Sequence, residues 1–294
     1  MEYSLSNSSE SNKTVDLVVT CYERTWRKTL SLGHFSRMVE YNPFPFSRRI
    51  VLINNVVDKE VVRSVAEDRK REGEIDDYFF VDDEIDRALL ILQLTRKDFG
   101  RAFYLSNWAL VAITLPGSQF LLHFDTENQV LPPYYDWITP SLELMERNPK
   151  ILACSPLVME TSTGKPSSIA TKNIVAESDD HLVLKPASFG DGCFLIRKED
   201  FLRIDYRERC VASLRYPLSY IEFSFEARID SWMRHNHCSL GLAKKSFLLQ
   251  PDNMGVGYPT DLNFQEKARK FFYRQLLSVV KRIPLRHKYN CLNF

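Results

Sequence analysis

The sequence lacks several features that would assign its class directly. Its 294 residues hold no stretch approaching the roughly 18 consecutive apolar residues that a membrane-spanning helix needs. The six cysteines lie far apart, without a C-x-x-C pair, and no apolar leader precedes them. We therefore expect reduced, mostly packed thiols in a cytoplasmic protein. The formal net charge is only +1, so nothing in the overall charge favours a nucleic-acid partner.

What the sequence does contain is typical of a globular α/β protein. Hydrophobic residues make up 44% and charged residues 26%, which supplies enough apolar material for a large core. Short apolar runs alternate with longer amphipathic ones, and this alternation predicts a mostly parallel central sheet flanked by helices. Residues 1–14 are rich in Ser, Asn and Glu and are expected to form a disordered tail.

The same patterns place the individual elements along the chain. We predict strands at 15–20, 49–54, 78–81, 119–124, 151–156 and 192–196. We predict helices at 26–40, 58–72, 103–113, 136–147, 198–202, 219–235 and 264–281. The polar segment 160–187 is predicted to be a mobile loop.

The segment FLLHFDTEN at 120–128 carries the clearest chemical signal. It is an apolar run that ends in two carboxylates, Asp125 and Glu127, followed by Asn128. Side chains two residues apart at a strand end lie on the same side, so both carboxylates can face one ligand. Oxygen ligands of this kind suit Mg²⁺ or Mn²⁺, with phosphates completing the coordination. The alternative interpretation is an ordinary solvated loop after a core strand.

Polar residues also follow the first two predicted strands. Thr20, Tyr22 and Arg24 end the first strand, and Asn54 ends the second. In open α/β sheets ligands bind outside the carboxyl ends of the strands, so these residues and Asp125 are expected at one edge. Each residue alone is a common turn former. Their shared position at one edge predicts a nucleotide site.

The order of these segments resembles the inverting glycosyltransferases of family 2, which have the GT-A fold. VDLVVTCYERT, beginning at residue 15, is similar to the first strand and nucleotide-contacting loop of that family. VLINNVVD at 51–58 has Asn54 where the family has Asp. FGRAFYLSNWAL at 99–110 has Gly100 and Asn107 at the expected separation, with Ser106 where Arg is common. FLLHFDTENQVLPPYYDWI resembles the D-x-D segment, with Glu127 as the second acid.

The resemblance implies a site for a nucleotide-diphosphate sugar, with a UDP-sugar favoured. Thr20, Tyr22 and Asn54 would contact the base, and Asp125 would accept from the ribose hydroxyls. Glu127, together with Asp125, would hold the divalent metal, Mn²⁺ or Mg²⁺, against the phosphates. Arg24 or Arg101 would face phosphate, or would form ordinary surface ion pairs.

The second half is expected to supply the acceptor chemistry. FGDGCFLIR at 189–197 resembles the glycine-bearing segment that lies under the donor sugar, which includes Gly190, Asp191 and Gly192; a tight turn is the alternative. IEFSFEARIDSWMR at 221–234 stands where the family places its catalytic base. Glu222 and Glu226 are four residues apart and are expected on one helix face. We favour Glu222 as the base because it lies nearest the expected helix start.

The predicted domain organisation follows the resemblance. Residues 15–258 are expected to form the catalytic domain, with a nucleotide-binding half at about 15–130 and an acceptor half at about 131–258. Residues 259–294 are predicted to form a basic amphipathic helical extension. Such a helix either packs on the domain or contacts the inner face of a membrane peripherally. Membrane contact would fit a saccharide or glycolipid acceptor.

The sequence therefore predicts a metal-dependent inverting glycosyltransferase that moves a sugar to an acceptor hydroxyl in polysaccharide or glycolipid synthesis. A nucleotidyltransferase is one alternative, but it would need a glycine-rich phosphate loop, and TCYERTWRK after the first strand has no glycine. A non-catalytic nucleotide-sugar-binding relative is the other. Asn54, Ser106, Glu127 and the absence of an adjacent Glu-Asp pair before the last catalytic helix favour that alternative.

Overall fold

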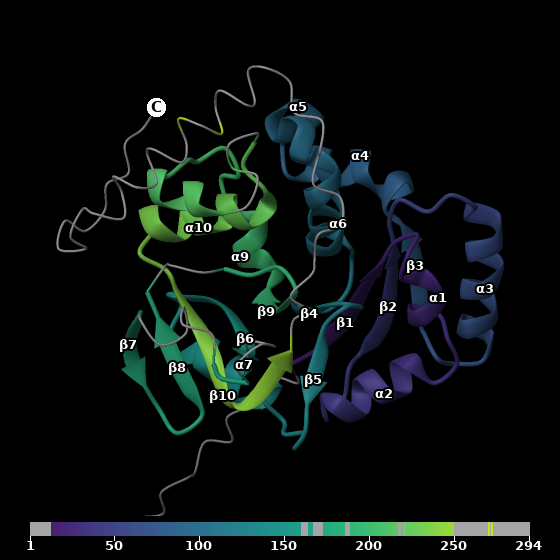
Figure 1. Ribbon diagram of the computed structural model, residues 1–294, viewed down its shortest axis with the longest axis horizontal. Coiled ribbons are helices and arrows are strands. Elements are labelled where there is room, and N and C mark those ends of the chain that lie inside the picture. The colour runs from purple at the N-terminus through teal and green to yellow at the C-terminus, as the bar shows by residue number, and fades with distance from the viewer. Residues whose placement is uncertain are drawn as a thin grey trace, which may run out of the picture.

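A twisted sheet runs through the whole molecule (Figure 1). The computed structural model describes residues 13–159, 164–166, 173–185, 189–216, 219, 222–249, 270 and 272. Over these residues the strand order is β3-β2-β1-β4-β9-β6-β10-β8-β7, and β5 pairs with β10 off this path. The strands are β1 (Val15–Cys21), β2 (Arg48–Ile53), β3 (Asp77–Phe80), β4 (Phe120–Asp125), β5 (Gln129–Leu131), β6 (Ile151–Met159), β7 (Ile174–Glu177), β8 (His181–Leu184), β9 (Cys193–Arg197) and β10 (Ser239–Leu249).

The direction of the strands divides the sheet into two parts. β3, β2, β1 and β4 are all parallel neighbours, and they form the purple to teal half of Figure 1. β9 then runs antiparallel between β4 and β6, while β6 and β10 are parallel to each other. β8, β7 and β5 add antiparallel pairs at the far side. The predicted α/β class, a central sheet flanked by helices, is confirmed.

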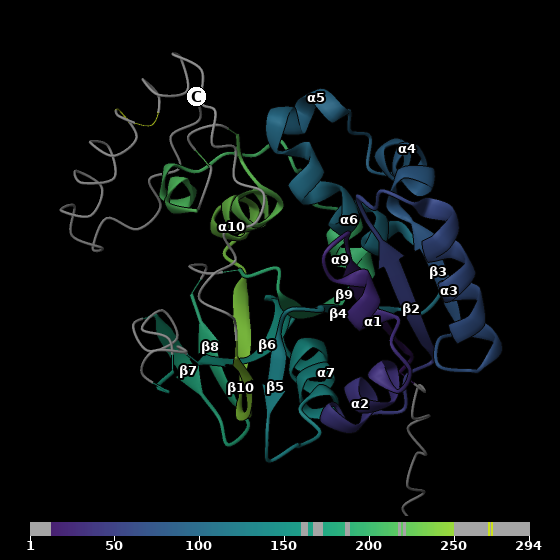
Figure 2. The same ribbon diagram turned by 45° about the vertical axis from the view of Figure 1, so that its right-hand side comes forward.

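Helices cover both faces of the sheet (Figure 2). They are α1 (Trp26–Thr29), α2 (His34–Tyr41), α3 (Lys59–Arg71), α4 (Val81–Ile91), α5 (Arg96–Phe99), α6 (Phe103–Thr114), α7 (Ile138–Arg147), α9 (Lys198–Leu202) and α10 (Phe225–His235), with the short 3₁₀ segments η1 (Gly100–Ala102) and η2 (Val211–Arg215). Apolar side chains of α4, α6, α9 and α10 pack on one face, and those of α1, α2, α3 and α7 pack on the other. In β1, Val18 faces α6 while Val19 faces the opposite layer, as strand alternation requires.

Several predicted elements differ from those observed. The helix predicted at 219–235 begins only at Phe225, because Ser224 caps it by accepting a hydrogen bond from the N–H of Ala227. The segment 160–187, predicted as a loop, contains β8 and the edge strand β7. β7 is exposed along its whole length, so it lacks the apolar alternation that identifies a strand from sequence. β10 and α4 were not predicted.

Some predictions fall outside the described residues. The disordered tail at 1–14 is described only at positions 13 and 14. The C-terminal extension at 259–294 is described only at Lys270 and Phe272, so its helix and its membrane contact stay predictions. The five cysteines that the structure describes are all buried and free, as expected from their spacing.

A buried ion pair fixes the start of the sheet. The Asp16 carboxylate accepts two hydrogen bonds from Arg48, at 3.2 and 2.6 Å, and two from the backbone and hydroxyl of Ser118, at 3.0 and 2.7 Å. Burial alone would raise the pKa of Asp16, but these hydrogen bonds outweigh it and lower the pKa below its usual value. The carboxylate therefore joins β1, β2 and the turn that precedes β4.

We expect Asp16→Asn to lower the free energy of unfolding by about 2 kcal/mol at pH 6, because charge-assisted hydrogen bonds are lost. A carboxylate with a lowered folded pKa stabilises fully above its unfolded pKa of about 3.9, and this contribution disappears as pH falls through the folded pKa. Urea unfolding from pH 6 down to pH 2.5 should show the two proteins converging below about pH 4. Asp68→Asn, at a half-exposed position on α3, is the control, and an equal loss there would contradict the expectation.

Candidate functional site

Three neighbouring strands bring polar side chains to one edge and one face of the sheet. In the parallel register, Thr20 of β1 lies beside Leu52 of β2 and Asp125 of β4. Asn54 follows β2, and its backbone N–H donates to the carbonyl of Cys21 at 2.8 Å. By alternation, Thr20, Asn54 and Asp125 point to the face that α6 covers. The predicted grouping of these residues at the strand ends is therefore observed.

Asn54 and Asn107 form a reciprocal amide pair. The Nδ2 of Asn54 lies 3.1 Å from the Oδ1 of Asn107, and the Nδ2 of Asn107 lies 3.3 Å from the Oδ1 of Asn54. Both side chains are buried, which makes this pair a specific link between the end of β2 and α6. The Oδ1 of Asn107 also accepts from the backbone N–H of Trp108 at 2.8 Å, so of the two amides only Asn54 keeps a second lone pair, whereas each keeps a second N–H.

The two predicted metal ligands lie in one turn, beside the end of β1. The phenol of Tyr22 donates a hydrogen bond to Oε1 of Glu127, and burial together with this carboxylate raises the pKa of Tyr22. The backbone N–H of Glu127 lies 3.5 Å from Oδ1 of Asp125. Burial first, and then the charges of Asp191 and Glu127, raise the pKa of Asp125 to about 7. The turn thus collects more negative charge than the protein neutralises.

Hydroxyl groups and an amide hold this turn in place. The hydroxyl of Thr126 donates to the carbonyl of Thr20 at 2.8 Å and lies 2.7 Å from the hydroxyl of Thr29. The Nδ2 of Asn128 donates to the carbonyl of Gly192 at 2.6 Å. A Cβ on Gly192 would lie 2.6 Å from that Nδ2, so the position requires glycine. Asp125 and Asn128 are therefore fixed against the segment that precedes β9.

Asp191 and Glu226 form a pair of carboxyl groups next to this turn. The backbone N–H of Asp191 donates to Oε1 of Glu226 at 3.2 Å, and the two side chains share a hydrogen bond. Burial first, and then the charge of Asp191, raise the pKa of Glu226 well above its usual value; burial also raises the pKa of Asp191. Each side chain keeps partial exposure. Two carboxyls this close titrate as one coupled pair, and burial favours their protonated forms.

Glu222 lies in a different environment from Glu226. It precedes α10, so the expectation that both carboxylates share one helix face is wrong, because Ser224 starts the helix. The Oε1 of Glu222 lies 3.7 Å from Arg209 and 3.6 Å from Arg228. Its Oε2 lies 2.9 Å from where a Cβ of Gly100 would stand. Gly100 has φ +50°, a backbone conformation that favours glycine.

The remaining predicted site residues are exposed at the surface. Arg24 is exposed, and its charge opposes the pKa rise of Tyr22. Arg101 is also exposed. Gly190 is exposed, with nothing within 4 Å of where its Cβ would stand.

Sequence reasoning missed His123, which is completely buried in β4. Its Nε2 lies 2.9 Å from the hydroxyl of Thr20, and its Nδ1 lies 3.1 Å from the carbonyl oxygen of Asp191. The ring stacks against Trp108, at 4.2 Å between centroids, and against Phe194, at 4.9 Å. A histidine two residues before the D-x-E pair was the available signal, since it interrupts an apolar run.

The donor set fits a divalent cation only in combination with a ligand. Within the described ranges, no three His, Cys, Asp or Glu side chains gather as a metal site on their own. Asp125 and Glu127 provide two carboxylates with excess negative charge, and the buried Oδ1 of Asn128 in the same turn has no hydrogen-bond partner among the described residues. Mg²⁺ characteristically takes one or two protein carboxylates and completes its shell with water and phosphates.

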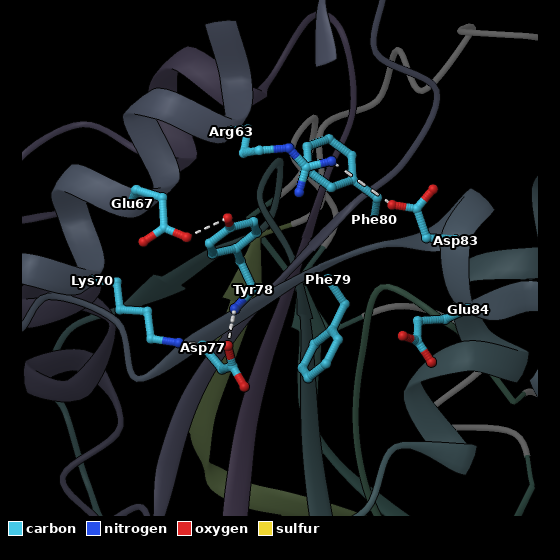
Figure 3. A pocket seen from close by; sticks show the side chains of 9 residues that line it. All are labelled: Arg63, Glu67, Lys70, Asp77, Tyr78, Phe79, Phe80, Asp83 and Glu84. Carbon is cyan, nitrogen blue, oxygen red and sulfur yellow. Dashed lines mark hydrogen bonds and ion pairs between the residues drawn. The ribbon is translucent and has the colours of Figure 1, made fainter. Parts of the chain in front are cut away.

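A separate polar hollow of about 250 Å³ lies at the edge strand β3, between α3 and α4 (Figure 3). Its polar groups are already paired with one another. Tyr78 donates to Glu67 at 2.6 Å, and Lys70 binds Asp77 at 3.0 Å. None of its lining residues belongs to the candidate site, and nothing in it indicates a ligand.

The sheet order, with carboxylates directly after β4, is that of the GT-A fold, which was predicted and is confirmed. A solved structure with a TM-score above 0.5 shares it at low identity. GalNAc-T7, crystallised with UDP, GalNAc and Mn²⁺, is 12% identical, with a TM-score of 0.52 over 90% of this chain and 48% of that chain. TarS from S. aureus is 10% identical, with a TM-score of 0.45 over 92% of this chain and 44% of that chain. This chain therefore spans about half the length of these two proteins.

Sequence comparisons give no family assignment. No protein-family model matches the chain, and no curated protein sequence matches it. Among the helices that the structure describes, none has the length and apolar character to cross a membrane.

Proposed function

We propose that this protein is a glycosyltransferase that moves a sugar from a nucleotide-diphosphate donor to an acceptor hydroxyl. The observation that carries the proposal is the grouping of Thr20, Asn54 and Asp125 at three adjacent strand ends, beside Glu127 and next to the Asp191–Glu226 pair. The fold, shared with GalNAc-T7 in complex with UDP and GalNAc, supports a nucleotide-sugar donor. A uridine diphosphate sugar is the favoured donor, and a saccharide or glycolipid is the favoured acceptor.

The strand ends would bind the nucleotide part of the donor. Thr20, Tyr22 and Asn54 would contact the base, and Asp125 would accept from the ribose hydroxyls. Gly190 and Gly192 lie on the segment beside Asp191, where exposed backbone at Gly190 leaves room for the sugar. Gly100 and Asn107 support the site from α6 and the segment before it. Arg24, which is exposed and lies two residues after Tyr22, would provide a positive charge for the diphosphate.

Asp125 and Glu127 would hold a divalent cation, Mn²⁺ or Mg²⁺, together with the donor phosphates. When bound, the cation supplies positive charge that stabilises the diphosphate as it leaves. Burial, and then the charges of Asp191 and Glu127, disfavour the ionised form of Asp125, and such a cation would stabilise it. The bond between Tyr22 and Glu127 would orient the second ligand.

Glu226 rather than Glu222 is the better placed general base. Glu226 is paired with Asp191, and the charge of Asp191 acts on Asp125. The pair is therefore close to the carboxylate that would bind the sugar donor. Glu222 instead faces Arg209, Arg228 and Gly100. The Asp191–Glu226 pair would accept the proton of the acceptor hydroxyl as that oxygen attacks the anomeric carbon. A single displacement of this kind inverts the configuration.

Calorimetric titration tests the proposal. UDP-, GDP- and dTDP-sugars are titrated with and without Mn²⁺ into the wild type, Asp125→Asn and Glu127→Gln. We expect metal-dependent binding of one donor, weakened about tenfold or more in both variants, since even residues that only orient ligands change metal affinity 10- to 100-fold.

The chain offers a matched control for this titration. Asp82 and Glu84 form another D-x-E sequence, on α4. Asp82 is exposed and pairs with Lys59, and Glu84 is half-buried and pairs with Arg87. Asp82→Asn/Glu84→Gln should bind the donor like the wild type. If no donor binds the wild type under any condition, the glycosyltransferase proposal is wrong.

A further inference from the structure

Two hydroxyl groups stand at the carboxyl end of β1, and both have their hydrogen atom directed at a protein acceptor. The Tyr22 phenol donates to Glu127, a carboxylate that offers only lone pairs. The Thr20 hydroxyl lies 2.9 Å from the Nε2 of His123. What the Thr20 hydroxyl can offer a ligand therefore depends on which nitrogen of His123 carries the hydrogen.

The surroundings of His123 settle its tautomer. The imidazole is completely buried against Trp108 and Phe194, and its two nitrogens face only an uncharged hydroxyl and a backbone carbonyl, so the ring is neutral with one N–H. Its Nδ1 lies 3.1 Å from the carbonyl oxygen of Asp191, which can only accept. The hydrogen must therefore be on Nδ1, because the other tautomer would place two acceptors in contact.

This tautomer makes Nε2 an acceptor, and the Thr20 hydroxyl its donor. Thr20 is then left with lone pairs and no hydrogen for a ligand, like Tyr22 beside it. Thr20 lies next to Asp125 in the register of β1 and β4, at the strand ends where the proposed donor would bind. Asn54 does not share this restriction, because its amide keeps one free N–H and one free lone pair.

We propose that His123 is a positioning residue that turns Thr20 into an acceptor-only contact, so that the site selects a nucleobase with an N–H at the centre of its pairing edge. Uracil, thymine and guanine have this N–H, whereas cytosine and adenine present a bare ring nitrogen there. The inference rests on the proposed function and specifies its donor class. A contact that can only accept disfavours a ligand atom that can also only accept, because both atoms would stay unpaired.

Binding of free nucleoside diphosphates tests this without any transfer reaction. UDP is compared with CDP, and GDP with ADP, by calorimetry in the presence of Mn²⁺. We expect the wild type to bind UDP about tenfold more tightly than CDP, the size of one hydrogen bond. His123→Phe keeps an aromatic ring packed against Trp108 and Phe194 but removes both nitrogens, which frees the Thr20 hydroxyl to donate. The preference for UDP should then fall to about twofold or less.

Thr20→Val gives a second route to the same answer if His123→Phe does not fold. It removes the hydroxyl while keeping the shape of the side chain, and it should also abolish the preference. Thr114→Val is the control, since its hydroxyl bonds only to carbonyls within α6, and its preference should match the wild type. Wild-type preference for CDP, or an unchanged UDP preference in folded Thr20→Val, would overturn the inference while leaving donor binding intact. Absence of binding by any nucleotide would instead contradict the proposed function itself.

Discussion

Replacing Glu226 with glutamine is expected to reduce sugar transfer about 10²- to 10⁴-fold while leaving donor binding unchanged. Glutamine has the size of glutamate and can still meet the N–H of Asp191 through its carbonyl oxygen, but it cannot take up a proton. Asp191→Asn should cause a loss of similar size, and the double variant little more, because two groups that titrate as one coupled pair act as a unit. Slow transfer to water from a radiolabelled donor provides a rate without knowledge of the acceptor.

Glu222→Gln is the matched control for this prediction. Its carboxylate bonds to guanidinium groups of Arg209 and Arg228, so the change should act on stability more than on the rate of transfer. A loss of activity in Glu222→Gln with full activity in Glu226→Gln would return the role of base to Glu222. Donor binding by all three proteins, with no transfer by the wild type to water or to any acceptor, would favour a non-catalytic nucleotide-sugar-binding protein.

The strand ends could be predicted from the sequence because they follow from local rules. A continuous apolar run that stops at Asp125 marks a buried strand and its end, and parallel neighbours must place Thr20, Asn54 and Asp125 at one edge. Asn54 and Asn107 were predicted as residues of one site, but their hydrogen bonds to each other were not. That pairing depends on how α6 packs on the sheet.

Other features depend on side-chain directions that periodicity does not encode. His123 and Arg228 are both completely buried, although composition alone would place an arginine at the surface. The apolar pattern around 221–225 extends the predicted helix of α10 toward its N-terminus, whereas the Ser224 cap starts it later and separates Glu222 from Glu226. The hydrogen bond between Asp191 and Glu226 joins residues that are 35 positions apart and meet only in the folded chain.

Arg228 joins the segments that carry these two glutamates to the rest of the α6 layer. Its guanidinium donates to the carbonyl of Phe223 at 2.9 Å, to that of Tyr206 at 2.6 Å and to that of Asp98. It also stacks over Phe99, with 3.9 Å between the guanidinium carbon and the ring centroid. Burial first, and then the nearby charge of Arg209, lower its pKa to about 9.

We expect Arg228→Met to lower the free energy of unfolding by about 3–5 kcal/mol, measured by urea unfolding at pH 7, because one side of a buried, hydrogen-bonded pair is removed. Three backbone carbonyls would then lose a hydrogen-bond donor, and the carboxylate of Glu222 would lose an ion-pair partner at 3.6 Å. Arg203→Met is the control: that arginine is 68% exposed and pairs with Glu199 one helical turn away, so its loss should change stability by less than about 0.5 kcal/mol. Equal stabilities of the two variants would show that methionine packing compensates for the lost bonds, as happens when some buried ion pairs are replaced by apolar groups. Arg228 would then be dispensable for stability, and any loss of transfer in the variant would have to come from a displaced Glu226.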